Sequence, residues 1–462
     1  MNDKLLLKKN PLLAALICLL PSIFSCKKYL DAKPDKSLVT PTTVQSLQGI
    51  LDYSPYMNQL STLSGEVASD NYYLTDALFA SLSDDRMRNA YLWQGHIFNG
   101  IHPDDWQNEY TTVYNTNVVL DNLPSIARTP SNAEAWDNCK GQALVFRAKS
   151  FFEIAQVWAK AYDSATAASD MGIPLRLTSD FNAPTTRASI KASYEQIIND
   201  LKEAIPLLPD VPVFVFRPSK PAAYGMLARI YLVMGDYRDA ALCADSCLAI
   251  KSTLVDYNTL NTVTKYPFSS LQYSNPEDIM HSTAISVNEN LKPTMGRIDT
   301  ALYGSYASND LRKTVFFKAN SDGSYYFTGN YNGSTSSVSY NGLAVDELYL
   351  IRAECAARLG DVDGAMTSLN TLLVKRWKTG TFVPLVANNV TDALGLILSE
   401  RRKELVYRSL RFGDIKRLNR DGAGIVLKRV INGTTYTLDP NDKSYALPIP
   451  DNVIQETGIQ QN

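Results

Sequence analysis

The sequence predicts a mostly α-helical protein, a tetratricopeptide-like scaffold of helical pairs that carries long insertions of loop and short strand. Two similar stretches support this prediction, Ala228–Ala240 and Ala353–Ala365. In each, an apolar helical segment ends at Gly-Asp, and an alanine begins a second segment soon afterwards. Small residues let two helices approach, glycine supplies a positive φ and aspartate caps the next helix. This combination is typical of tetratricopeptide units.

Residues 256–342 support the second half of the prediction. They are rich in Tyr, Ser, Asn, Gly and Thr, contain few helix-forming runs and are centred on Ser324–Gly333. A connection of this length is far outside the routine range and is usually functional or a subdomain. We therefore expect the helices to form a scaffold and this insertion to form the ligand-binding region.

The first 25 residues are predicted to be a lipoprotein signal peptide. Three lysines precede an apolar run that begins at Pro11; the run is too short to span a bilayer and fits a secretory signal. Ser25 before Cys26 is similar to a bacterial lipobox, so Cys26 is the predicted acylation site and lipid anchor. A plain secretory signal and a buried N-terminal helix are the alternatives. The residues after Cys26 suffice for one large domain or for two to three smaller ones.

Apolar periodicity and start signals predict the remaining helices. They open at Thr42–Gln45 and cover 104–123, 133–160 and 392–420, with further helix pairs within 106–160 and from 194–209 onward. Near the end, Tyr445–Pro450 is predicted to be extended because two prolines restrict it.

Two charged stretches are interpreted as structural. Basic residues of Glu400–Leu418 alternate with Glu400, Glu404 and Asp414, which favours ion pairs between helices over anion binding. Asp361–Gly364 is similar to a fragment of a calcium-binding loop, but no glutamate follows at the required distance. We interpret it as the turn between two helices.

Composition excludes several classes of function. The formal net charge of −2 offers no basic footprint for nucleic acid. No ligand spacing for a metal is present among the three histidines, and no cofactor is predicted. Four cysteines of the body are scattered and are expected to be buried free thiols, with one bridge at most; they are Cys139, Cys243, Cys247 and Cys355.

Tyrosine-rich stretches with polar neighbours are the candidate ligand site. Sugars present flat apolar faces rimmed by hydroxyls, so a carbohydrate site needs exposed aromatic platforms beside amide and acid groups. Such groups occur around residues 69–73, at 93 and at 325–331, where loops are predicted. Trp106 and Trp158 lie on apolar helical faces and are expected in the core. The candidate glycan-binding residues are Asn71, Tyr72, Tyr73, Trp93, Tyr326 and Tyr331.

The chain resembles the SusD/RagB family of Bacteroidetes outer-membrane lipoproteins. Five stretches carry the resemblance: Cys26–Pro34, Trp106–Asn122, Asp346–Glu354, Glu400–Leu418 and Leu447–Asn462. The resemblance implies that residues 26–462 form a single domain with a scaffold of four tetratricopeptide units. It also implies capture of glycans without catalysis, and lipid-anchored display on the outer membrane. It also implies a partner, a SusC-type TonB-dependent porin that receives the oligosaccharide.

Two other functions stay open from the residues alone. A peptide- or protein-binding tetratricopeptide scaffold would use the concave helical face. A glycoside hydrolase would need a pair of carboxylates; Glu66 and Asp70 could pair on a helical turn, but no positioned constellation surrounds them, and we expect no enzyme. If glycan capture is right, the helical face docks the transporter and the inserted loops meet the glycan.

Overall fold

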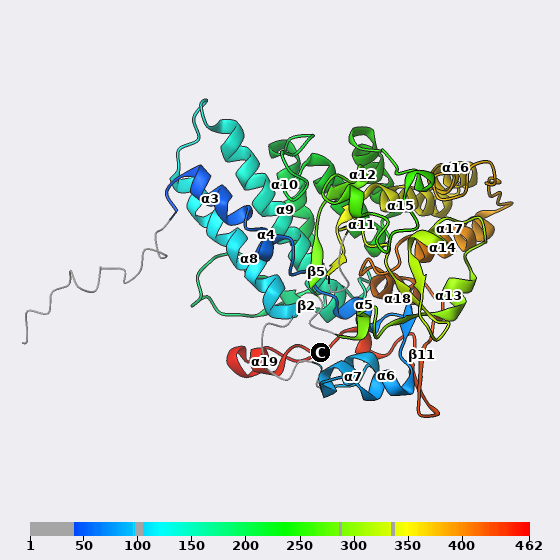
Figure 1. Ribbon diagram of the computed structural model, residues 1–462. Coiled ribbons are helices and arrows are strands. Elements are labelled where there is room, and N and C mark those ends of the chain that lie inside the picture. Colours follow the sequence, from blue (N-terminus) through cyan, green and yellow to red (C-terminus); the bar gives the residue numbers. More distant parts are fainter. Residues whose placement is uncertain (1–40, 96, 98–104, 286–288, 334–337) are drawn as a thin grey trace, which may run out of the picture. The chain divides into compact units, whose positions relative to one another are not determined.

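The computed structural model of the protein describes residues 41–95, 97, 105–285, 289–333 and 338–462 (Figure 1). Residues 43–462 form one compact unit, and this unit alone is described below. The predicted signal peptide (1–25), Cys26 and the residues as far as 40 lie outside the described residues.

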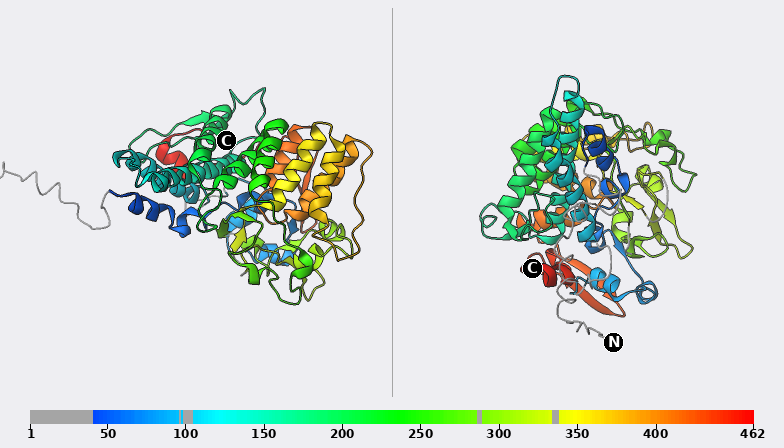
Figure 2. Two further views of the ribbon diagram at one scale, coloured as in Figure 1. Left: turned by 90° about the horizontal axis from the view of Figure 1, so that it is seen from above. Right: turned by 90° about the vertical axis from the view of Figure 1, so that its left-hand side faces the viewer.

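Helices dominate the unit, as the sequence predicts. All but the last of the longer ones pack in chain order, each against its neighbour (Figure 2). They are α8 (Asp105–Asn122), α9 (Ala133–Trp158), α10 (Ile190–Ala204), α11 (Lys220–Met234), α12 (Tyr237–Ile250), α15 (Val345–Arg358), α16 (Val362–Leu373), α17 (Val390–Glu404) and α18 (Arg411–Arg420). Shorter helices are α3 (Val44–Leu51), α4 (Ser54–Met57), α5 (Ser64–Ala68), α6 (Asp76–Ala80), α7 (Asp85–Tyr91), α13 (Thr300–Gly304), α14 (Arg312–Val315) and α19 (Asp451–Thr457).

The two Gly-Asp turns have the predicted geometry. Gly235 ends α11 with a φ of 84°, and Gly360 follows α15 with a φ of 90°, a region that side chains disfavour. Asp236 then accepts a hydrogen bond from the backbone of α12, and Asp361 accepts one from the Gly364 amide at 2.8 Å. Each turn therefore joins a helical pair, α11 with α12 and α15 with α16, and the calcium-loop fragment is an N-cap.

Other predicted elements are present with small changes. The helix predicted over 104–123 is α8 and that over 133–160 is α9; Trp106 and Trp158 are both buried and meet edge to face at 5.3 Å. The single helix expected over 392–420 is wrong. It breaks between α17 and α18 because Tyr407 and Ser409 adopt positive φ values of 62° and 60°.

Short two-stranded antiparallel sheets fill the spaces between helices. They pair β1 (Tyr72–Tyr73) with β6 (Arg297–Ile298), β2 (Met171–Pro174) with β3 (Arg187–Ser189), β4 (Asp278–Met280) with β10 (Leu343–Ala344), β5 (Thr283–Ile285) with β9 (Val338–Tyr340), β7 (Phe317–Ala319) with β8 (Tyr325–Phe327), and β11 (Leu427–Ile431) with β12 (Thr434–Leu438). Six of these twelve strands, β4 to β9, belong to 256–342, the predicted insertion of loop and short strand.

Buried ion pairs hold this insertion against the helices. Arg376, after α16, donates to Glu404 of α17 at 2.6 Å and to Glu277 of the insertion at 2.8 Å. Arg312 of the insertion donates to Glu404 at 3.0 Å and to Glu400 at 2.5 Å. Because these side chains are buried, removing one partner would leave an uncompensated charge.

The basic cluster of α17 and α18 is structural, as predicted. Arg401 donates to Asp414 at 2.8 Å, and Arg417 binds Glu354 of α15 through two nitrogens at 2.6 and 2.8 Å. Burial would raise the pKa of Asp414, but the charges of Arg401 and Arg417 outweigh it and lower that pKa to about 2. The guanidinium groups thus link three helices.

The four cysteines of the described unit are free thiols, which confirms the expectation from the sequence. Three of them are buried and Cys243 is half-buried. Burial raises the pKa of Cys139 and of Cys247 to about 12, which makes both thiols unreactive at neutral pH.

Candidate ligand-binding site

The aromatic residues predicted to form a platform near residue 72 instead surround a buried arginine. The Arg429 guanidinium, on β11, lies 4.9 Å from the Tyr72 ring centroid, 4.2 Å from that of Tyr91 and 5.2 Å from that of Trp93. Tyr72 is 1% exposed and Trp93 7%. The exposure predicted for Tyr72 is therefore wrong, and Trp93 is a core residue. We call these four residues the Arg429 cage.

Hydrogen bonds complete the Arg429 cage. Arg429 donates to the backbone carbonyls of Ser69 and Tyr72. The Tyr72 hydroxyl donates to the Val67 carbonyl at 2.9 Å, and the Trp93 indole N–H donates to the Ala68 carbonyl at 2.9 Å. Because these side chains are buried and bond to the protein's own backbone, they present no surface to a sugar.

Asn71 and Glu66 are buried beside the cage. Asn71 Nδ2 donates to Glu66 Oε1 at 2.8 Å, and the Ser409 amide donates to Glu66 Oε2 at 3.0 Å. Burial raises the pKa of Glu66 to about 7, although these hydrogen bonds act in the opposite direction. Asn71 therefore binds a buried carboxyl group. It has no exposed surface for the glycan contact that the sequence predicts.

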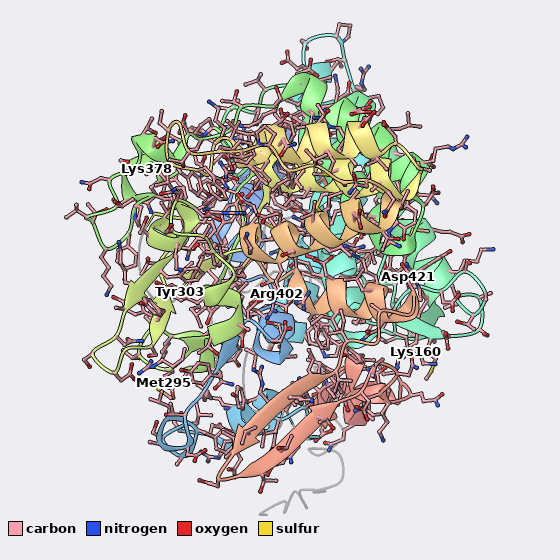
Figure 3. All side chains as sticks on the ribbon, turned by 90° about the vertical axis from the view of Figure 1, so that its right-hand side faces the viewer. Lys160, Met295, Tyr303, Lys378, Arg402 and Asp421 are labelled. Atoms are coloured by element: carbon pink, nitrogen blue, oxygen red, sulfur yellow. The ribbon has the colours of Figure 1, made fainter. Side chains whose placement is uncertain are left out.

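Asp70 is engaged by arginines and does not face Glu66 across a cleft. Burial would raise the pKa of Asp70, but the hydrogen bond and charge of Arg411 and the charge of Arg402 outweigh it and lower that pKa. Arg411 Nε lies 2.7 Å from Asp70 Oδ1, and Arg402, labelled in Figure 3, lies 3.2 Å from Oδ2. Both carboxyl groups are thus committed to structural partners.

The other predicted site residues divide into one buried and two half-buried side chains. Tyr331 is buried, and its hydroxyl donates to Glu277 Oε2 at 2.7 Å, so its predicted exposure is wrong. Tyr73 on β1 and Tyr326 on β8 keep partial exposure. They belong to different sheets, and the Tyr326 ring has Lys265 5.8 Å from its centroid.

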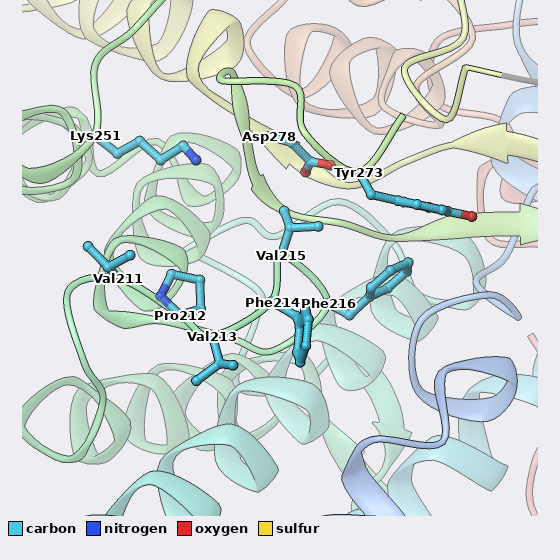
Figure 4. A pocket seen from close by; sticks show the side chains of 9 residues that line it. All are labelled: Val211, Pro212, Val213, Phe214, Val215, Phe216, Lys251, Tyr273 and Asp278. Carbon is cyan, nitrogen blue, oxygen red and sulfur yellow. The ribbon is translucent and has the colours of Figure 1, made fainter. Parts of the chain in front are cut away.

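A cavity of about 380 Å³ lies elsewhere, between the segment before α11 and the insertion (Figure 4). This volume is within the range of ligand sites. Its lining consists of one continuous segment, one lysine at the end of α12 and two residues of the insertion. These are Val211, Pro212, Val213, Phe214, Val215, Phe216, Lys251, Tyr273 and Asp278.

Exposed aromatic rings border this cavity. Phe214 is 64% exposed and Tyr273 51%, and the Phe216 ring packs 5.1 Å from that of Tyr273. Tyr273 has a φ of 60°, which is unusual for a bulky residue and often marks a functional position. The rings offer the flat apolar surface that a sugar face needs.

The polar wall of the cavity is built on Asp278. Its Oδ2 lies 2.5 Å from His281 Nδ1, and its Oδ1 accepts from the Tyr340 hydroxyl at 2.7 Å. His281 in turn packs against the rings of Phe216 and Tyr273, at 5.0 and 5.2 Å. The aromatic rim is therefore fixed by a buried hydrogen-bonded group beneath it.

Sequence reasoning identified the insertion but missed the residues of this cavity. Tyr273 lies within the predicted region 256–342, whereas Phe214 lies outside it. A usable signal was the run Val211–Phe216, which has no helical period, alternates valine and phenylalanine from Val213 on, and comes shortly before a predicted helix. Two aromatic residues in such a connecting segment are candidates for exposure.

Neither a metal centre nor a membrane span is found among the described residues. No group of three or more His, Cys, Asp or Glu side chains there could hold a metal ion. Within the same residues, every helix is too short or too polar to cross a bilayer.

Two family models match the chain. One, described as starch-binding and associating with the outer membrane, matches residues 28–232. The other describes the SusD family and matches residues 294–462. None of the curated proteins matches the chain.

Solved structures share the fold over almost their whole length. A candidate sugar-binding protein from Bacteroides vulgatus is 20% identical, with 92% of this chain and 99% of that one covered and a TM-score of 0.74. A SusD superfamily protein from Bacteroides thetaiotaomicron is 19% identical, with 91% and 99% covered and a TM-score of 0.71. A laminarin-binding SusD-like protein is 18% identical, with 92% and 99% covered and a TM-score of 0.64. At these identities the likeness shows the fold.

Proposed function

Because the chain belongs to the SusD/RagB family, we propose that it captures an oligosaccharide or polysaccharide and passes it to a SusC-type TonB-dependent transporter. The family is one of carbohydrate-binding proteins associated with the outer membrane. The observation that best supports a glycan ligand is the cavity, at whose rim Phe214 and Tyr273 are exposed.

The cavity has the chemistry of a carbohydrate site. The rings of Phe214 and Tyr273 can cover the apolar face of a sugar, while the charged side chains of Lys251 and Asp278 line the same space. Stacking on fixed rings costs little conformational entropy. Tyr73 and Tyr326 keep partial exposure, and we retain them as a second place for glycan contact.

The anchor and the transporter complete the proposal. Acylation of Cys26 after removal of residues 1–25 would hold residues 26–462, as a single domain, at the outer membrane, displayed on the cell surface. The helical face would dock the transporter, and the insertion would meet the glycan. Glycan capture requires no catalytic group, in keeping with the two carboxyl groups that are already bound to structural partners.

A glycan-binding screen of the full chain in detergent micelles tests this proposal. The double variant Phe214→Ala/Tyr273→Ala should lose saturable binding, because both exposed rings of the cavity are removed. Phe181→Ala is the matched control, since Phe181 is 76% exposed but does not line the cavity. A further variant, Tyr326→Ala, tests the second place.

Each outcome has a defined meaning. Binding that only the double variant loses supports the cavity as the site. Binding that the double variant keeps and Tyr326→Ala loses moves the site to the insertion surface. The absence of binding to every glycan contradicts the proposed function.

A peptide ligand is the second candidate. Val211, Val213 and Phe214 give the cavity an apolar, exposed wall that would also fit a peptide side chain. A peptide library that binds the wild-type chain while no glycan does would favour this function.

A further inference from the structure

Lys251 is the one cation among the residues that line the cavity. It follows the end of α12, and its side chain extends toward Asp278 across the cavity (Figure 4). Within the described part of the chain, no carboxylate lies within 4.0 Å of its ammonium group and no acceptor binds it. An ammonium group has three donors to satisfy.

Asp278 does not satisfy this lysine. Both of its carboxylate oxygens are already engaged, one by His281 at 2.5 Å and the other by Tyr340 at 2.7 Å, and the side chain is buried. Its charge attracts Lys251, but burial has the larger effect and lowers the pKa of the lysine. The ammonium is therefore partly desolvated and only partly compensated.

The rest of the lining offers few acceptors to the ammonium. Valine, proline and phenylalanine side chains supply most of it, and Tyr273 contributes a ring to the opposite side. A cation held in such surroundings gains most from an anion that enters with the ligand, because charge-assisted hydrogen bonds are about twice as strong as neutral ones.

We propose that the cavity takes an acidic sugar, whose carboxylate or sulfate group pairs with Lys251 Nζ while its ring lies on Tyr273. This inference rests on the proposed glycan capture and names the class of glycan. The carboxylate and the sulfate share the chemistry that Lys251 recognises, a compact anion with several acceptor oxygens. A neutral glycan would leave the ammonium with hydroxyl acceptors alone.

The test uses the full chain in detergent micelles with matched pairs of polysaccharides. Uronic-acid polymers are compared with their carboxyl-reduced forms, and sulfated polymers with their desulfated forms. The wild-type chain should bind the acidic member of at least one pair about tenfold more tightly, and this preference should shrink at high salt. The pair that shows the preference identifies carboxylate or sulfate as the anion.

Two variants of Lys251 are the controls. Lys251→Met keeps the length of the side chain without its charge and should abolish the preference for the acidic member of the pair. Lys251→Arg keeps the charge and should keep the preference. A helix-capping role for Lys251 would instead lower the melting temperature of Lys251→Met, whereas the inference expects it unchanged or higher.

The inference fails separately from the proposed function. Wild-type binding to neutral glycans without any preference for an acidic member overturns the inference and leaves glycan capture standing. A preference that persists in Lys251→Met also overturns it. If no glycan of either kind binds, both the inference and glycan capture are wrong.

Discussion

The Arg429 cage and the cavity contain the same ingredients, a cation and several aromatic rings, but they present them in opposite ways. In the cage, the Arg429 guanidinium contacts three rings and donates to backbone carbonyls. In the cavity, the Lys251 ammonium meets no acceptor among the described residues, and Phe214 and Tyr273 stay exposed. The cage is core because its rings and its cation bury one another, whereas in the cavity two rings stay exposed and the cation keeps unused donors.

The largest effect is expected from Arg429→Met. The variant leaves the carbonyls of Ser69 and Tyr72 without their donor and removes the cation from three rings, so the free energy of unfolding should fall by about 3–5 kcal/mol. Urea denaturation measures this. Lys428→Met is the control, because Lys428 is the exposed neighbour on the same strand. Equal losses in the two variants would contradict a structural role for the cage.

A second, pH-dependent effect is expected at Glu66 beside the cage. Burial raises the pKa of Glu66 to about 7, above its ordinary value, so the native state binds the proton more tightly than the unfolded state. The stability from this group is full below about pH 4.5 and is lost as pH rises through 7. Glu66→Gln should therefore gain about 2 kcal/mol relative to wild type between pH 5 and pH 8.

Denaturation curves at several pH values measure this difference. Asp70→Asn is the contrasting variant, because the pKa of Asp70 is lowered and its contribution is lost in acid instead. A difference between Glu66→Gln and wild type that stays constant over this pH range would show that Glu66 is ionised in the folded protein.

The smallest effect is expected when one tyrosine hydroxyl is removed from the Arg429 cage or from the cavity. Tyr72→Phe removes the hydrogen bond to the Val67 carbonyl and should cost about 1 kcal/mol of unfolding free energy without changing glycan binding. Tyr273→Phe removes a hydroxyl from a half-exposed residue and should change stability by less than about 0.5 kcal/mol. Thermal unfolding of the pair is the measurement. A larger loss of stability in Tyr273→Phe than in Tyr72→Phe would contradict the core role of Tyr72 and the exposed position of Tyr273.

The scaffold could be predicted because its signals are local. The glycine and aspartate of each turn act within a few residues, and the apolar period of α8 and α9 is visible in any window of their sequence. The break between α17 and α18 was missed because Tyr407 and Ser409 have positive φ values, which neither a tyrosine nor a serine indicates in a sequence.

The exposure of the candidate site residues could not be predicted, because the exposure of a side chain depends on partners that are distant in the sequence. Arg429 reaches the backbone of Tyr72 across 357 residues of sequence, and Glu277 reaches the Tyr331 hydroxyl across 54. Polar neighbours in sequence favoured exposure for both tyrosines, whereas each is buried by a charged group that no local pattern reveals. The insertion is present as loop and short strand, but the exposure predicted for Tyr331 within it is wrong.

The ion pairs that bind the insertion to the helices also limit how such proteins can be recombined. Glu277 and Arg312 come from the insertion, while Arg376 and Glu404 come from the helical body. A chimera that exchanges residues 256–342 for those of a relative would inherit a matching set of buried charges only if the donor carries the same acid and base at both positions. Under the proposed function, an exchange of ligand specificity would therefore move short loops such as the one that bears Tyr273 and leave these buried charges in place.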